Sequence, residues 1–311
     1  MAENLQDALT YFKALAEQTR LRLLKVLMRH ELNVNELVAI MAMGQSRISH
    51  HLKVLTESGL LSWRREGSKV YYSACTQGPG AEVIERVGPL LADDEVSDQD
   101  LARARDTIEQ RAEATRRFFN AIAANWDQLR RDVLGDLDLA GAVTGQMAGH
   151  RVAVDLGCGT GGMLPALLER AERVIGVDSS PKMLQQARRR FANDGRRVSL
   201  RIGELEHLPL RDGEADFAVA SLALHHLSRP QDGLVEAHRV LQDGGRLVVV
   251  EFDRHHNEQM RTRYGDHWLG FSLKRLAGWL ERSGFSLAQT RRLPVNQGLA
   301  VHILTANKNQ Q

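Results

Sequence analysis

Hydrophobic residues recur at helical spacing through the first part of the chain, from Ala8 to Ser58. Asn33, followed by Glu36, has the pattern of a capped helix start, and Gly44 and Gly59 lie where helices should end. Residues 60–74 instead suggest two short strands around a Gly67–Ser68 turn. The pattern thus predicts a basic β-hairpin preceded by helices over 7–15, 18–30, 33–43 and 45–58. Helices followed by such a hairpin are typical of a winged helix-turn-helix domain.

From Arg151 onward, strand-like and helical stretches alternate. We expect strands over 151–156, 173–178, 197–202, 215–221, 246–252 and 300–306. Helices are expected near 161–171, 181–193, 230–241 and 272–284. This alternation predicts an α/β Rossmann-like fold with a doubly wound, mostly parallel sheet, which binds ligands beyond the carboxyl ends of its strands.

A helix over 82–91 and an acidic stretch, DDEVSDQD (93–100), separate these two regions. We interpret the acidic stretch as a solvated linker that leads into connecting helices. The expected organisation is a winged helix-turn-helix domain over 1–92, a linker with helices over 93–145, and a Rossmann-like domain over 146–308.

Composition and charge narrow the class of protein. The 311 residues are 43% hydrophobic and 26% charged, which is typical of a folded chain. No apolar run approaches the ~20 residues of a membrane span, and the amino terminus lacks a signal-peptide pattern. Two cysteines make no disulfide framework, so we expect a cytoplasmic protein with no membrane partner. Residues 10–75 carry ten basic and five acidic side chains, a net charge of +5, which favours a nucleic-acid partner.

The first domain carries the pattern of a DNA reader. The segments FKALAEQTRLRLLKVL (12–27), QSRISHHLKVLTESGLL (45–61) and WRREGSKVYYS (63–73) resemble the ArsR family of winged-helix repressors. A helix fits the major groove, where polar side chains reach base edges, while basic hairpin residues contact phosphates or the minor groove. The candidate DNA-binding residues are Gln45, Ser46, Arg47, Ser49, His50, Arg64, Arg65 and Lys69. The alternative is a solvated helix face and loop without function.

Several members of that family sense soft metals through a Cys-x-Cys pair at the start of the third helix. This chain has Asn33 and Asn35 there, and amides are poor ligands for soft metals. The pairs His50–His51, His225–His226 and His255–His256 show no regular ligand spacing. We therefore expect no metal site.

A glycine-rich loop opens the second domain. VDLGCGTGG (154–162) follows a predicted strand and precedes a helix, and its glycines also satisfy a dinucleotide-binding pattern. Asp155 favours a cationic ligand over a pyrophosphate. Asp178 ends the next predicted strand, where it can accept hydrogen bonds from both ribose hydroxyls.

This loop resembles that of class I S-adenosylmethionine-dependent methyltransferases, and the resemblance runs over most of 150–252. SSPKMLQQARRRF (179–191), GELEHLPL (203–210) and SLALHHL (221–227) carry it further, although Glu204 and Leu205 replace the usual Asp and Ala. FFNAIAANWDQLR (118–130) resembles the helix that covers the cofactor in ubiquinone/menaquinone methyltransferases. The resemblance implies S-adenosylmethionine or S-adenosylhomocysteine as ligand, held by Trp126, Asp155, Gly157, Cys158, Gly159, Asp178, Ser179, Met183, Glu204, Leu205 and Ser221.

Two functions remain open. The fusion resembles S-adenosylhomocysteine-responsive ArsR-type regulators of the methionine cycle, which implies a homodimeric repressor of operator DNA. Alternatively the chain is a small-molecule methyltransferase with a DNA-binding module. His225 and His226 are then candidate general bases, although histidines that merely pack beside the pocket fit equally well. Ser221–Leu224 replaces the Asn/Asp-Pro-Pro-Tyr element of amino-methyltransferases, which argues against methylation of adenine bases.

Overall fold

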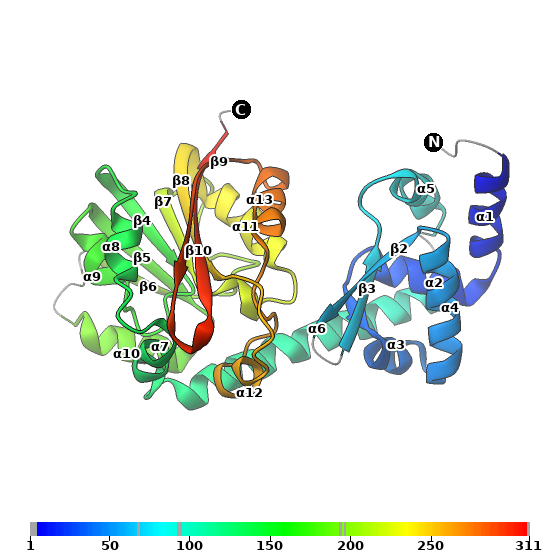
Figure 1. Cartoon of the computed structure of the whole chain (residues 1–311), viewed down its shortest axis with the longest axis horizontal. Helices are drawn as coiled ribbons and strands as arrows, with labels where there is room; N and C mark the ends of the chain where they lie inside the picture. Colours follow the sequence, from blue (N-terminus) through cyan, green and yellow to red (C-terminus); the bar gives the residue numbers. More distant parts are fainter. Residues whose placement is uncertain (1–4, 67–68, 92–94, 193–194, 196, 310–311) are drawn as a thin grey trace. The chain divides into compact units, whose positions relative to one another are not determined.

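The computed structural model describes residues 5–66, 69–91, 95–192, 195 and 197–309, with the backbone alone described at 95–97 (Figure 1). The chain divides into two compact units, Met1–Arg111 and Ala112–Gln311. Each unit has its own hydrophobic core.

The first unit is a helical domain with a small antiparallel sheet of order β1-β3-β2. Its elements are α1 (Leu5–Leu15), α2 (Gln18–Leu27), β1 (Leu32–Asn33), α3 (Val34–Met41), α4 (Gln45–Glu57), β2 (Leu61–Glu66), β3 (Lys69–Ala74), α5 (Pro79–Val87) and the 3-10 helix η1 (Gly88–Leu91). The predicted helices and both hairpin strands are therefore present. The predicted turn at Gly67–Ser68 lies outside the described residues.

Local signals set the helix ends in this unit. The Asn33 side chain accepts hydrogen bonds from the backbone N–H groups of Asn35 and Glu36, and Glu36 accepts one from the Asn33 N–H, which completes a capping box. Gly59 follows α4 with a φ of +76°, as predicted. Helix α3, however, ends through Ala42 in the left-handed conformation, and Gly44 precedes α4 as its N-cap.

Most of the acidic stretch is helix, which corrects the prediction of a solvated linker. Helix α6 runs from Glu95 to Ile122. Asp100 is fully buried and accepts two hydrogen bonds from Arg22, at 2.7 and 3.0 Å. Lys25 donates to Asp98 at 3.0 Å. The sequence shows a run of like charges, but the cations that neutralise it lie on α2, more than 70 positions upstream.

The second unit contains a seven-stranded sheet of order β6-β5-β4-β7-β8-β10-β9, which confirms the predicted fold class. Its strands are β4 (His150–Leu156), β5 (Ala171–Asp178), β6 (Val198–Ile202), β7 (Ala215–Ser221), β8 (Leu241–Phe252), β9 (Phe285–Pro294) and β10 (Ala300–Lys308). Strands β4 to β8 pair in parallel, and β10 pairs antiparallel with both β8 and β9. The chain order reverses between β4 and β7, where an open α/β sheet binds its ligand.

Helices cover both faces of this sheet (Figure 1). One face packs against α7 (Trp126–Leu134), α8 (Leu139–Thr144), α9 (Leu164–Leu168), α10 (Pro181–Arg190) and α12 (Gln259–Tyr264). The other packs against α11 (Pro230–Val240) and α13 (Leu273–Arg282). Short 3-10 helices lie at η2 (Leu224–His226) and η3 (Asn296–Gly298). No helix among the described residues is both long and apolar enough to cross a membrane.

Strand β9 is the one strand of this sheet that the sequence analysis did not predict. It is an edge strand, and its middle, from Leu287 to Arg292, is largely polar and exposed. An edge strand with one neighbour needs little apolar character, and charged side chains there discourage pairing with another chain. Hydrophobic alternation is therefore weak in this segment.

Candidate functional sites

The glycine loop follows β4 at the point where the strand order reverses. Gly157, Gly159 and Gly161 all have positive φ angles, of +77°, +53° and +78°. A Cβ atom on Gly157 would lie 2.8 Å from the Cβ of Ala223, so only glycine fits there without displacing a neighbour. The loop therefore leaves bare backbone at the carboxyl edge of the sheet.

Asp178 ends β5 beside this loop. Its two carboxylate oxygens accept backbone hydrogen bonds from Gly159 and Ser180, each at 2.8 Å. Burial raises the pKa of Asp178 to about 6, and the charge of Glu204 adds to this rise, although the two backbone donors oppose it. The carboxylate is thus held in one orientation by the loop, with its charge stabilised by little else.

Asp155 lies one strand away, 2% exposed. Burial raises its pKa to about 7; the charge of Arg130 opposes the rise and that of Asp178 adds to it. Arg130 comes from α7, and its guanidinium reaches the loop: a Cβ on Gly162 would lie 2.9 Å from Arg130 Nη1. The site therefore holds a buried carboxylate, Asp155, and a half-buried one, Asp178, near the single guanidinium of Arg130.

Helix α7 covers the glycine loop, as the resemblance of FFNAIAANWDQLR implies. The indole nitrogen of Trp126 lies 3.3 Å from the position a Cβ would take on Gly159. Asp127 accepts hydrogen bonds from Thr160 Oγ1 and Arg190, both at 2.5 Å. The sequence analysis missed Asp127, Arg130 and Thr160, although the first two lie within the segment that resembles a covering helix.

The carboxyl-terminal part of α6 adds to this cover. Asn120 Oδ1 accepts hydrogen bonds from Ser180 Oγ at 2.8 Å and from the Lys182 backbone at 3.2 Å. Arg116 forms an ion pair of 3.3 Å with Glu204. Neither Asn120 nor Arg116 was predicted, because their contacts depend on how the helix folds back over the sheet.

The structure brings the predicted ligand residues together at one edge of the sheet. Cys158, Met183 and Leu205 are buried, and Ser179 is half-buried. Ser221 Oγ is buried and has no hydrogen-bond partner. A glycine-rich loop, two carboxylates and a small number of apolar side chains fit an adenosyl group with a charged amino-acid end.

Beyond the loop lies a narrow pocket that contains both candidate histidines. Its walls are Trp126, Arg130, Val133, Leu134, Leu222, His225, His226, Phe252, Met260, Tyr264 and Asp266. His225 Nδ1 lies 2.6 Å from Glu251 Oε2, and His225 Nε2 lies 3.5 Å from Asp266 Oδ1. His226 Nδ1 lies 3.2 Å from the Gly265 carbonyl.

The two histidines have opposite charge preferences. Burial lowers the pKa of His225, but the charges of Glu251 and Asp266 outweigh it and raise that pKa to about 9. Burial and the neighbouring His225 hold the pKa of His226 well below its usual value. At neutral pH, His226 is therefore a neutral ring beside a protonated His225, and the surroundings that keep it neutral also make it a weak base.

The candidate base-reading residues lie on the exposed face of α4. Gln45, Ser46, Arg47, Ser49 and His50 are all exposed, whereas Ile48, Leu52 and Leu55 on the opposite face are fully buried. The exposed and buried faces of α4 are therefore the ones that its hydrophobic periodicity predicts.

The hairpin residues differ from one another. Arg65 and Lys69 are exposed. Arg64 is half-buried, donates to Glu31 at 2.7 and 2.9 Å, and stacks 4.5 Å from the centre of the Tyr71 ring. Contact between Arg64 and phosphate stays a prediction, and these pairs compete with it.

Asn33 and Asn35 lie in and beside the capping box, so the position at which some family members carry a Cys-x-Cys pair serves here to start α3. Cys75 is half-buried and Cys158 is buried, and burial raises the pKa of both thiols. A thiol with a raised pKa is a poor nucleophile and a poor metal ligand at neutral pH.

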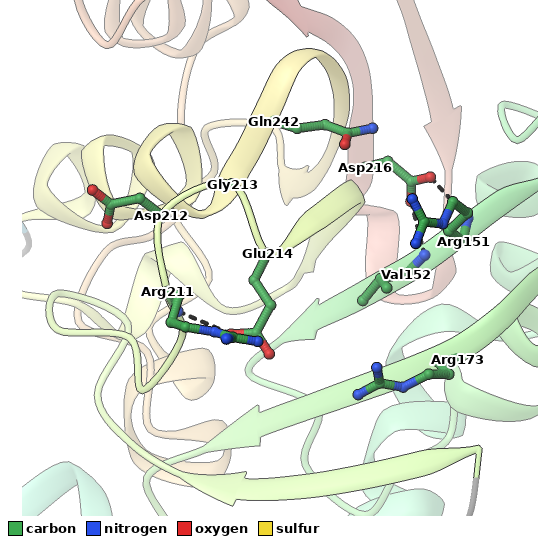
Figure 2. Close-up of a pocket in the computed structure, with 9 residues that line it drawn as sticks. All are labelled: Arg151, Val152, Arg173, Arg211, Asp212, Gly213, Glu214, Asp216 and Gln242. Atoms are coloured by element: carbon green, nitrogen blue, oxygen red, sulfur yellow. Dashed lines mark hydrogen bonds and ion pairs between the residues drawn. The ribbon is translucent and has the colours of Figure 1, made fainter.

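A second pocket lies at the opposite, amino-terminal edge of the sheet (Figure 2). Arg151, Arg173 and Asp216 come from β4, β5 and β7, and Arg211 and Glu214 from the turn before β7. Asp216 accepts backbone hydrogen bonds from Arg151 and Val152, and Glu214 accepts one from Arg211 (Figure 2). The Asp216 carboxylate thus joins β7 to β4, and Glu214 closes the turn that leads into β7.

Comparison with known proteins identifies both parts of the chain. Residues 154–249 match the family described as methyltransferase domain, and residues 17–62 match the family described as bacterial regulatory protein, arsR family. An uncharacterised 37.1 kDa protein of transposon TN4556 from Streptomyces fradiae is 39% identical over 48% of this chain. The chain spans only 43% of the length of that relative.

Other relatives lie among the methyltransferases. The demethylmenaquinone methyltransferase of Tropheryma whipplei (strain Twist) is 35% identical over 52% of this chain and 68% of its own length. The solved structure of a 1,6-didemethyltoxoflavin-N1-methyltransferase from Burkholderia thailandensis, with 1,6-didemethyltoxoflavin and S-adenosylhomocysteine bound, superposes with a TM-score of 0.53. That match has 22% identity and covers 65% of this chain and 91% of the other, so it shows a shared fold.

Proposed function

Because the chain belongs to the methyltransferase family that includes the demethylmenaquinone methyltransferases, and carries an arsR-family region, we propose that it is a ligand-controlled transcriptional repressor. Its second unit binds S-adenosylmethionine or S-adenosylhomocysteine, and the bound ligand controls the affinity of the first unit for operator DNA. Methionine-cycle genes are the proposed targets.

The ligand site follows from the geometry at the carboxyl edge of the sheet. Asp178 accepts the ribose hydroxyls, and the loop from Gly157 to Gly159 lies against the amino-acid end. Arg130 and Asp155 face the carboxylate and the amino group of that end. Cys158, Ser179, Met183, Leu205 and Ser221 line the remainder, and Glu204 accepts from the adenine amino group.

DNA recognition follows from the exposed face of α4. Arg47 and Gln45 read base edges in the major groove, with Ser46, Ser49 and His50 beside them. Lys69 and Arg65 contact the phosphate backbone. Reading a two-fold operator requires two recognition helices, and hence a homodimer.

Exposed apolar side chains support the homodimer. Leu5, Leu9 and Phe12 fall on one face of α1 and are exposed, and Leu90 in η1 is 82% exposed. Large apolar groups gathered on one face are typical of an interface.

Helix α6 is the observation that carries the proposal of control. Its first half belongs to the first unit: Leu101 and Ala104 are buried in that core, and Arg111 forms an ion pair with Glu36. Its last turns belong to the ligand site of the second unit, through Arg116–Glu204 and Asn120–Ser180. One unbroken helix thus carries residues of both units, and a ligand that changes the contacts of its last turns acts on an element of the DNA-binding core.

The testing experiment is a titration of each ligand with and without operator DNA. S-adenosylhomocysteine should bind and weaken operator binding, because a ligand shifts a two-state equilibrium when its affinities for the two states differ. Binding of ligand without any change in operator affinity contradicts the proposal.

The pocket around His226 favours a second function, methyl transfer to a small molecule. S-adenosylmethionine supplies an electrophilic methyl group when bound. The unprotonated Nε2 of His226 can accept a hydrogen bond from an acceptor hydroxyl or amine and so orient it, with Glu251 and Asp266 holding His225 beside it. Turnover of S-adenosylmethionine in the presence of candidate acceptors separates this function from the first.

A further inference from the structure

Three side chains in the second unit converge around buried polar atoms that make no hydrogen bond. His225 and His226 lie in η2, directly after β7, and Asp266 lies in the segment after α12. One ligand atom from each lies within 4.8 Å of the other two. His225 is 2% exposed, Asp266 is 4% exposed and His226 is half-buried, so most of the group is shielded from bulk water.

The polar atoms at the centre of this group are unsatisfied. Both carboxylate oxygens of Asp266 and the Nε2 atom of His226 are buried and make no hydrogen bond. His225 Nε2, at 3.5 Å from Asp266 Oδ1, is too distant for a strong bond. A buried polar atom left without a partner destabilises the fold, and more so when it is charged. Contacts within the protein therefore leave three polar atoms of this group without a hydrogen-bond partner.

The outer contacts of the two rings match those of metal-bound histidines. Metal-ligating histidines donate their other ring N–H to a carboxylate or a backbone carbonyl. His225 Nδ1 meets Glu251 Oε2 at 2.6 Å, and His226 Nδ1 meets the Gly265 carbonyl at 3.2 Å. Glu251 is itself held, because its Oε1 accepts from the Leu224 backbone at 2.7 Å. Both rings therefore leave Nε2 as the open ligand atom, and the Asp266 carboxylate lies close to both rings.

We propose that His225, His226 and Asp266 bind a divalent transition-metal ion. Two imidazoles and one carboxylate form a donor set that suits Fe²⁺ or Zn²⁺ and leaves coordination positions open. A dication also balances the two buried carboxylates, Asp266 and Glu251. This differs from the sequence-based expectation of no metal, because Asp266 lies far downstream and joins the two histidines only through the fold.

The open coordination positions face the pocket beside the glycine loop. Leu222, Phe252 and Met260 are among its walls, and Trp126 and Tyr264 close its other sides. An ion there takes a small oxygen-donor molecule, such as a carboxylate or an enolate, as its further ligand. The proposal is independent of DNA binding and of ligand control.

The test is metal binding by the full-length chain. Protein is stripped with a chelator, incubated with Zn²⁺, Co²⁺ or, without oxygen, Fe²⁺, desalted, and analysed for metal per chain. We expect one ion per chain, and a Co²⁺ absorption spectrum with nitrogen and oxygen ligation. Asp266→Asn and His226→Gln should each weaken binding at least 10-fold, and Glu251→Gln by about 10–100-fold.

His150→Gln is the matched control. His150 lies 3.7 Å from the Asp216 carboxylate at the opposite edge of the sheet, so this variant also removes a histidine with an acidic neighbour. It should bind metal as the wild type does. Thermal unfolding and S-adenosylhomocysteine binding report folding of each variant; if Asp266→Asn does not fold, His226→Gln and Glu251→Gln decide. Absence of a stoichiometric ion in the wild type, or its retention in the folded variants, overturns the proposal.

Discussion

The amide oxygen of Asn120, in the last turns of α6, accepts a 2.8 Å hydrogen bond from the hydroxyl of Ser180. Ser180 is two positions after Asp178, donates its backbone N–H to that carboxylate, and caps α10. Any ligand that moves Asp178 therefore acts on a residue bonded directly to α6.

Asn120→Ala removes this bond. Loss of one neutral hydrogen bond costs about 1 kcal/mol, so S-adenosylhomocysteine affinity should fall about fivefold. The effect of the ligand on operator affinity should shrink further, toward none, as measured by fluorescence anisotropy. Gln128→Ala is the control, because Gln128 is an exposed amide of α7 that bonds Asp132 away from the loop. If S-adenosylhomocysteine changes the operator affinity of Asn120→Ala as much as that of the wild type, the Asn120–Ser180 contact has no role in the control of DNA binding.

Asp178→Asn tests the ribose contact. The variant keeps the shape of the side chain and loses the charge that accepts two hydroxyl hydrogen bonds, worth about 1.5–3 kcal/mol each. Its amide nitrogen also cannot accept one of the two backbone hydrogen bonds from Gly159 and Ser180. We expect S-adenosylhomocysteine affinity to fall on the order of 100-fold by calorimetry. Asp243→Asn, at an exposed position, is the control. An affinity within threefold of the wild type would exclude Asp178 from the site.

Ligand affinity should also depend on pH. Asp178 has a raised pKa of about 6 and accepts ribose hydroxyls in its ionised form. Protonation on acidification removes the acceptor, so affinity is highest above pH 7 and falls as the pH drops through 6. A pKa of 6 in the free protein gives about a tenfold loss of affinity between pH 7 and pH 5. Calorimetry across this pH range checks the assignment. The same measurement on Asp178→Asn should lack the part of the pH dependence that comes from titration of Asp178.

Two variants separate base reading from phosphate contact in the first unit. Arg47→Ala should cost about 1–3 kcal/mol on operator DNA alone, because a base-edge contact discriminates between sequences. Lys69→Ala should weaken binding to every sequence and lower the salt slope by about one. Equal losses on operator and random DNA for Arg47→Ala would contradict its base-reading role.

The sequence predicts the elements well where periodicity is strong. The buried face of α4, the capping box at Asn33, and the parallel strands through β8 all follow from local pattern. It fails where partners come from far along the chain. Asp100 looks like part of a solvated linker until Arg22 neutralises it.

The same limit applies to the site. Asp155, Asp178 and the glycines are recognisable because their spacing is local. Arg130 and Asn120 reach the site only because two helices fold over the edge of the sheet, and Asp266 joins His225 through the tertiary structure alone. No periodicity connects these residues.

Control of DNA binding by ligand is tested most directly by a reciprocal titration. Operator affinity is measured with and without saturating S-adenosylhomocysteine, and S-adenosylhomocysteine affinity with and without saturating operator. The account predicts that each weakens the other by one common factor, about 5–150-fold, because coupling between binding sites is reciprocal. If all four affinities show no mutual effect, the two units are uncoupled and the proposed control of DNA binding by ligand is wrong.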